Sequence, residues 1–171
     1  MKKKAKLFTT IASLCMAVAL MAFGVYAATN QTLNVTSSVS FESATVLVDI
    51  KGTVTGAVET VTEYTYAHDA ADPNKQPTDW TISALTFDET HAVITYTIEV
   101  TNQSEFAIKV DVTGAPAAVD GQLKVEETGA TTASVAKGAK ATYTLTLTLE
   151  RFDESLASTA ANLKLVAQKA D

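Results

Sequence analysis

The sequence predicts an all-β protein: an antiparallel β-sandwich of the jelly-roll or immunoglobulin-like Greek-key type, preceded by a helical signal peptide. Three observations lead to this fold class. Apolar and polar residues alternate with period two through most of the chain after residue 27, which is typical of strands that bury one face. Threonine, whose β-branched side chain suits a pleated sheet, supplies 25 of residues 28–171. Turn residues separate the alternating runs, and no long segment has a helical period.

Residues 1–27 have the three parts of a secretory signal peptide. The chain opens MKKKAK, continues through an apolar run from Leu7 to about Val25, and places Val25 and Ala27 at the −3 and −1 positions of a signal peptidase site. The run is long enough to span a bilayer, so an uncleaved anchor is the alternative. Hydroxyl side chains within the run favour cleavage. We therefore expect an exported chain, secreted or held at the cell surface, with no membrane attachment after cleavage.

Cleavage after Ala27 would leave a single domain, residues 28–171, that is acidic and free of cysteine. The only cysteine, Cys15, follows Leu14 rather than a small residue, which argues against lipid attachment. Four of the 13 basic residues and none of the 19 acidic ones precede residue 28, so the formal charge becomes 9 − 19 = −10. Such a surface repels phosphate backbones and anionic lipids, and no nucleic-acid partner is expected. A domain of this size without disulfides suits a bacterial exported protein.

Alternating apolar runs account for most of the predicted strands. In the first run, Leu33, Val35, Val39 and Phe41 share one face, and Thr, Asn and Ser residues share the other. We expect about eight to ten strands in all. The clearest runs cover residues 33–41, 46–50, 80–87, 92–100, 106–112, 143–149 and 163–167.

Turn residues punctuate these runs. Gly52 and Gly56 are predicted to separate strands, and two prolines lie in the longest irregular connection, 72–77. Residues 152–161 are rich in Asp, Glu, Ser, Leu and Ala. That composition predicts a short helix or a loop before the last strand.

The alternation changes phase within the run from 80 to 87. Trp80 and Ile82 share one phase, whereas Leu85 and Phe87 share the other. One extra residue in a strand produces such a slip, so we expect a β-bulge there.

Candidate catalytic residues are few. After residue 27 the chain has no thiol, one arginine and two histidines, His68 and His91. Neighbouring side chains such as His68 and Asp69 diverge and make a poor catalytic pair, and His91 is most simply a turn residue. The chain contains none of the HExxH, GxSxG, phosphate-loop or dinucleotide-binding motifs. We therefore expect no enzyme, no catalytic residues and no cofactor.

A metal site in the 68–77 loop is a weaker alternative. His68, Asp69, Asp72 and Asn74 offer ligands that calcium accepts. Their spacing does not match the ordered EF-hand loop, and the two prolines explain an irregular segment without an ion. The prediction is no metal site, with calcium in this loop left open.

Three aromatic residues leave a further alternative. Tyr64, Tyr66 and Trp80 would form a sugar-stacking platform if their rings faced outward together. The simpler interpretation is that Trp80 belongs to the core, because a sandwich interior needs a few large rings.

The segment Thr29–Phe41 bears on assembly. It alternates over a long stretch directly after the predicted cleavage site, and a free terminal strand can pair with a sheet edge of another subunit. The alternative is an edge strand of its own domain.

The lysine-rich start, the apolar run that ends FGVYA, the alternating strand after it and the terminal strand Leu163–Ala167 together resemble the TasA/camelysin group of exported Firmicutes proteins. The resemblance implies a jelly-roll sandwich and, as in several of that group, a fibre subunit of the biofilm matrix. This chain lacks the consecutive glycines common before the cut in that group, and it has no metalloprotease motif. The stretches Tyr96–Ser104 and Val135–Leu145 also resemble the strand-and-turn pattern of immunoglobulin-like bacterial surface domains.

The expected function is that of a secreted structural protein of the cell surface or biofilm matrix of a Gram-positive bacterium. It would associate with itself, or with other surface proteins, through β-strand pairing. The alternative is a monomeric extracellular binding or adhesion module that recognises a glycan or a protein through loops such as 68–77.

Overall fold

The computed structural model describes residues 33–43, 46–58, 63–72, 74–88, 90–151 and 158–171. All of them belong to the compact unit Thr32–Asp171. The predicted signal peptide, residues 1–27, lies outside the described residues. In the described part, no helix is long and apolar enough to cross a membrane.

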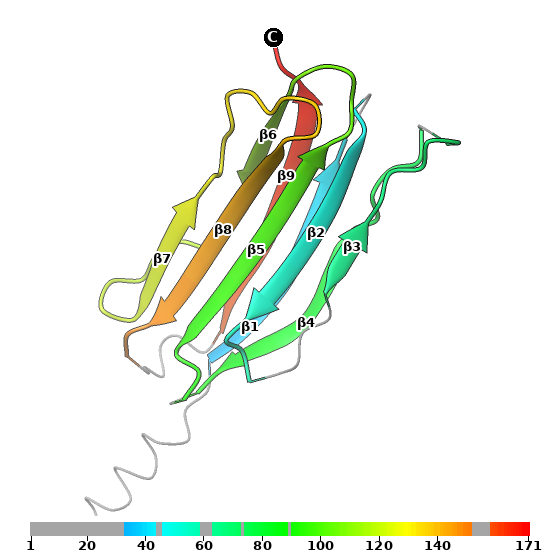
Figure 1. Cartoon of the computed structure of the whole chain (residues 1–171). Coiled ribbons are helices and arrows are strands. Elements are labelled where there is room, and N and C mark those ends of the chain that lie inside the picture. Colours follow the sequence, from blue (N-terminus) through cyan, green and yellow to red (C-terminus); the bar gives the residue numbers. More distant parts are fainter. Residues whose placement is uncertain (1–32, 44–45, 59–62, 73, 89, 152–157) are drawn as a thin grey trace, which may run out of the picture. The chain divides into compact units, whose positions relative to one another are not determined.

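Within the described residues, nine strands form two packed sheets, which confirms the predicted all-β sandwich. The order of strands is β4-β1-β9-β6 in one sheet and β3-β2-β5-β8-β7 in the other; Figure 1 shows the five-stranded sheet in front. Every connection except β2–β3 and β7–β8 passes between the sheets, as in Greek-key and jelly-roll sandwiches. The strands are β1 (Leu33–Glu42), β2 (Val48–Thr55), β3 (Tyr64–Tyr66), β4 (Trp80–Phe87), β5 (Val93–Asn102), β6 (Ile108–Thr113), β7 (Leu123–Thr128), β8 (Lys140–Leu149) and β9 (Ser158–Lys169).

One strand pair departs from the predicted antiparallel arrangement. β1 runs parallel to β9, in register from Asn34 opposite Ser158 to Glu42 opposite Val166. The other neighbouring strands within the described sheets are antiparallel. Parallel neighbours cannot be joined by a hairpin. Because β1 and β9 are the first and last described strands of the chain, no hairpin has to join them.

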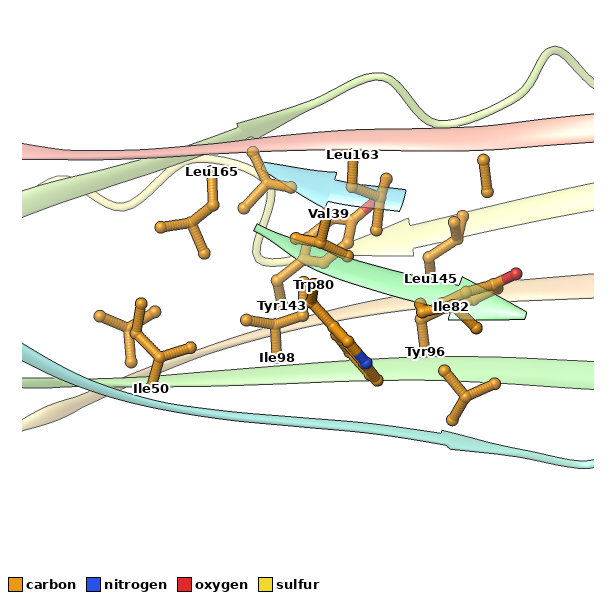
Figure 2. Close-up of a cluster of buried hydrophobic side chains, with 14 of the residues drawn as sticks. Val39, Ile50, Trp80, Ile82, Tyr96, Ile98, Tyr143, Leu145, Leu163 and Leu165 are labelled. Carbon is orange, nitrogen blue, oxygen red and sulfur yellow. The ribbon is translucent and has the colours of Figure 1, made fainter. Parts of the chain in front are cut away.

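Alternation along the long strands places one face of each sheet in the core. Figure 2 shows buried side chains from both sheets meeting between the layers. The outer face of the five-stranded sheet is rich in threonine; Thr53, Thr97, Thr144 and Thr128 follow one another across β2, β5, β8 and β7. The largest fully buried side chains are Tyr96, Phe87, Leu33, Ile50, Leu85, Ile94, Ile98, Ile108, Leu123, Leu145, Leu147 and Leu163.

The phase slip in β4 is a β-bulge, as predicted. Between Val35 and Ser37 of β1, the register with β4 shifts by one residue. β4 therefore has two residues, Ser83 and Ala84, where β1 has one, and both are exposed. The extra residue keeps the apolar side chains on both sides of the bulge in the core.

Gly52 does not separate strands, contrary to the prediction. It lies in the middle of β2, where a Cβ atom would overlap the ring of Trp80. The glycine is needed for this close approach, which lets Trp80 pack with only 6% of its surface exposed. Gly56, by contrast, follows the last residue of β2 and has a φ of 88°, so its predicted role at the end of a strand is confirmed.

The predicted boundaries are least accurate near the C-terminus. β9 already begins at Ser158, so the predicted helix or loop is wrong for residues 158–161, while residues 152–157 lie outside the described residues. β3 and β7 were not singled out from the sequence. β3 has only three residues and β7 carries three charged side chains in six residues, so neither shows a clear apolar alternation.

An irregular segment, residues 130–135, closes the outer edge of β6. The backbone N–H of Val112 donates to the carbonyl of Ala130, and that of Thr132 donates to the carbonyl of Val110. The hydroxyl of Thr132 also accepts from the N–H of Val110, at 2.7 Å. Covering a sheet edge in this way hinders uncontrolled pairing with other chains.

Candidate strand-exchange site

β1 is an interior strand of the four-stranded sheet. It pairs with β4 along one edge and with β9 along the other, as Figure 1 shows. The sequence-based alternative that Thr29–Phe41 is an edge strand of its own domain is therefore wrong for the described residues, 33–41; residues 29–32 lie outside them. The cause is β9, which occupies the edge that β1 would otherwise expose. We call the position between β4 and β9 the β1 slot.

The apolar side chains of β1 complete the core. Leu33, Val35 and Val39 are each at most 1% exposed. Full burial of a side chain of this size stabilises the folded state by about 1.5–3 kcal/mol. The net stability of a typical domain is only about 5–15 kcal/mol. The sandwich therefore depends on a strand in the β1 slot.

A buried serine breaks the apolar pattern on the inner face of β1. Ser37 is only 7% exposed, and its hydroxyl oxygen lies 2.5 Å from that of Tyr96. Tyr96 belongs to β5 in the opposite sheet and is fully buried. Burial raises the pKa of Tyr96 to about 12, and the hydrogen bond with Ser37 opposes part of that rise. The pair thus links the β1 slot to the other sheet through a single polar contact.

The C-terminal end of β1 lies against a stack of aromatic rings. The ring of Phe41 stacks on that of Tyr64 with centroids 4.9 Å apart, and Tyr64 stacks on Trp80 at 5.8 Å. The N–H of Phe41 donates to a carboxylate oxygen of Asp79. Trp80 is buried, which confirms the core interpretation. Because Trp80 lies in the core, Tyr64, Tyr66 and Trp80 do not face outward together, as a sugar-stacking platform of the three rings would require.

His68 pairs with Asp49 of β2 rather than with the adjacent Asp69. Its Nδ1 lies 2.7 Å from Oδ1 of Asp49, and its backbone N–H donates to the same oxygen at 2.9 Å. The amide of Gln103 donates to the other carboxylate oxygen. Burial acts to raise the pKa of Asp49, but the hydrogen bonds from His68 and Gln103 outweigh it and hold that pKa below its usual value. This network attaches the loop after β3 to the five-stranded sheet.

The four residues considered as calcium ligands are engaged in other contacts or exposed. Asp69 accepts from the backbone N–H of Ala71 at 2.9 Å, and Asp72 accepts from that of Asn74 at 3.2 Å. In the part of the chain that the structure describes, no three His, Cys, Asp or Glu side chains are grouped closely enough to hold a metal ion. Hydrogen bonds within the loop account for the positions of its carboxylates.

His91 lies in the turn between β4 and β5, as the sequence indicates. Its Nδ1 is 2.8 Å from Oδ1 of Asp88. The same oxygen accepts from the hydroxyl and the N–H of Thr90. These hydrogen bonds, from Thr90 first and then from His91, hold the pKa of Asp88 well below its usual range. The contacts cap a turn, which gives His91 a structural role.

No family model and no curated protein matches the chain.

Proposed function

We propose that the chain is an exported structural subunit of a bacterial cell surface or biofilm matrix, and that it polymerises by exchanging β1 between copies. One observation carries this proposal: the first described strand of the chain fills an interior position of a sheet, between two strands that come later in the sequence. The extracellular location is supported by the signal-peptide pattern and by the resemblance to the TasA/camelysin group.

A terminal strand can leave its slot without threading any other part of the chain through the fold. When β1 of one copy enters the slot of another, the same core contacts and the same ladder hydrogen bonds form again. The contact energies of the closed and exchanged forms therefore nearly cancel. The protein concentration then decides which form prevails.

Exchange of one strand gives each copy one donor and one acceptor site. Such an interface is heterologous, because the donated strand and the slot are different surfaces. Heterologous contacts build open filaments unless the rotation between copies happens to close a ring. A structural polymer is the natural product of this arrangement.

The test is the molar mass of residues 28–171, which contain the whole compact unit that begins at Thr32. We expect light scattering after size-exclusion chromatography to show a mass that increases over a hundredfold range of protein concentration. Electron microscopy of the largest fractions should show linear particles. A strict monomer at every concentration would contradict the proposal and would favour the binding-module alternative.

A further inference from the structure

We propose that the β1 slot accepts a strand from a second copy of this chain in a single register, and that the hydroxyl of Tyr96 selects this register by requiring a serine at position 37 of the incoming strand. This inference deepens the proposed function and rests on it. The partner is defined by its chemistry: an extended segment with apolar residues at 33, 35 and 39, a small hydroxyl-bearing residue at 37 and an aromatic ring at 41.

The contact between Ser37 and Tyr96 has the properties of a register marker. Both residues are buried, and each supplies the hydrogen-bond partner of the other. On the inner face of β1, the neighbouring positions two residues away are Val35 and Val39, which have no hydrogen-bonding side-chain atom. Among these inner positions, only residue 37 satisfies the hydroxyl of Tyr96.

Shifted registers carry distinct costs. A shift by one residue would exchange the two faces of the strand and turn Asn34 and Thr36 toward the core. A shift by two residues would keep apolar side chains inside, but it would place Val35 or Val39 at Tyr96. The buried hydroxyl would then lose its partner, and an unsatisfied buried polar group is expensive. The alternation of apolar and polar residues therefore excludes a shift by one residue, and the contact between Ser37 and Tyr96 excludes a shift by two.

Two further features of the β1 slot also favour a single register of the incoming strand. The bulge in β4 lies between the register positions of Val35 and Ser37, so a shifted strand would meet the extra residue at the wrong place. At the end of the strand, the ring of Phe41 stacks on Tyr64, and a shift by two residues would remove this stack. The slot therefore recognises the incoming strand at its middle and at its end.

The test uses peptides, because a change in the peptide cannot unfold the protein. Three peptides span residues 29–42: the native sequence, a Ser37→Val peptide and a matched Ser40→Val control, whose substitution lies on the outer face. Each peptide is added to the protein, residues 28–171, to compete for the β1 slot. Light scattering measures how far the peptide inhibits polymer growth. Binding of the fluorescently labelled peptides to the same protein is measured in parallel by anisotropy.

We expect the native and Ser40→Val peptides to inhibit at similar concentrations. The Ser37→Val peptide should require about tenfold more, which corresponds to about 1.4 kcal/mol and lies within the cost of an unpaired buried hydroxyl. On a Tyr96→Phe protein the preference should disappear or reverse, because no hydroxyl then needs a partner. A role of Ser37 that does not involve the Tyr96 hydroxyl would leave the preference unchanged in the Tyr96→Phe protein.

Equal inhibition by all three peptides on the unmodified protein would overturn the inference while leaving strand exchange intact. So would a preference for Ser37 that persists in the Tyr96→Phe protein. Peptides that bind with the expected preference to a chain that never polymerises would support register selection and contradict the proposed function. If no peptide binds and no polymer forms, both proposals fail.

Discussion

At the scale of single residues, buried polar side chains were the hardest feature to predict. The alternating pattern identified Leu33, Val35 and Val39 as the inner face of the first strand, and all three are buried. It did not identify Ser37, because a serine gives no apolar signal and its partner is 59 residues away along the chain. The role of Gly52 was missed for a related reason: its constraint is the ring of Trp80, which only the folded structure brings to it.

The buried hydroxyl of Tyr96 predicts a loss of stability in alkaline solution. Its pKa is raised from 10.0 to about 12 in the folded state. Between these values the unfolded chain releases the proton while the folded chain retains it, so the free energy of unfolding falls as the pH rises. At pH 11 the contribution of Tyr96 to this loss should be about 1.4 kcal/mol relative to pH 8. Urea unfolding at the two pH values measures it.

A Tyr96→Phe variant isolates this effect from the other tyrosines. Burial, and next the hydrogen bond with Glu127, also raise the pKa of Tyr143, so the unmodified protein should lose more stability than Tyr96 alone explains. The alkaline loss in the Tyr96→Phe variant should be smaller by about the 1.4 kcal/mol assigned to Tyr96. An identical pH dependence in the two proteins would show that the Tyr96 hydroxyl does not titrate differently on unfolding.

At the scale of strands, the local sequence pattern predicted which segments form strands and which of their side chains face the core. It did not predict which strands lie side by side. The long alternating runs became β5 and β8, and the change of phase within β4 became a bulge because both features are properties of one continuous segment. The interior position of β1 depends on its parallel pairing with β9, at the other end of the chain. No local pattern contains that information, so the sequence alone does not distinguish an interior strand from an edge strand.

The turn after β5 offers a test at this scale. Asn102 is fully buried; its amide donates to the carbonyls of Phe106 and Val135, both at 2.8 Å, and its oxygen accepts from the N–H of Ser104 at 2.8 Å. Asn102→Ala removes all three hydrogen bonds: the carbonyl of Phe106 and the N–H of Ser104 lose this partner, and the carbonyl of Val135 keeps only the N–H of Ile108. We expect the variant to lose about 2–4 kcal/mol of unfolding free energy, measured by urea denaturation.

The matched control is Asn34→Ala, which removes the same side chain from an exposed position on β1. Surface substitutions of this kind usually change stability by about 0.5 kcal/mol or less. Similar stabilities of the two variants would mean that solvent replaces the three hydrogen bonds of Asn102, and that the turn does not depend on its side chain.

At the scale of the whole molecule, the fold is complete in one chain and yet depends on a strand that could come from another. β1 brings buried side chains, two ladders of hydrogen bonds and the contact with Tyr96. All of these can form with a second copy as well as within one chain. Strand exchange and a self-contained fold therefore differ in the origin of the strand in each slot, and a covalent link between β1 and β4 reports that origin directly.

Asn34 and Thr86 are a suitable pair for such a link. They lie opposite each other in β1 and β4. The carbonyl of Thr86 accepts from the N–H of Val58, so it points away from β1, and the pair is a non-hydrogen-bonded one with Cα atoms about 4.5 Å apart. That separation permits a disulfide. No cysteine follows Cys15 in the sequence, so Asn34→Cys with Thr86→Cys adds the only two thiols of residues 28–171.

The decisive measurement is a non-reducing denaturing gel of this double variant, oxidised either as a monomer or after assembly. Strand exchange predicts that oxidation of the monomer closes the link within one chain and blocks polymer growth until a reductant is added. Oxidation after assembly should instead give a ladder of covalent multimers, because each strand is then linked to the next copy. Polymers that run as single chains after oxidation would show that every slot holds its own β1, which would contradict the account.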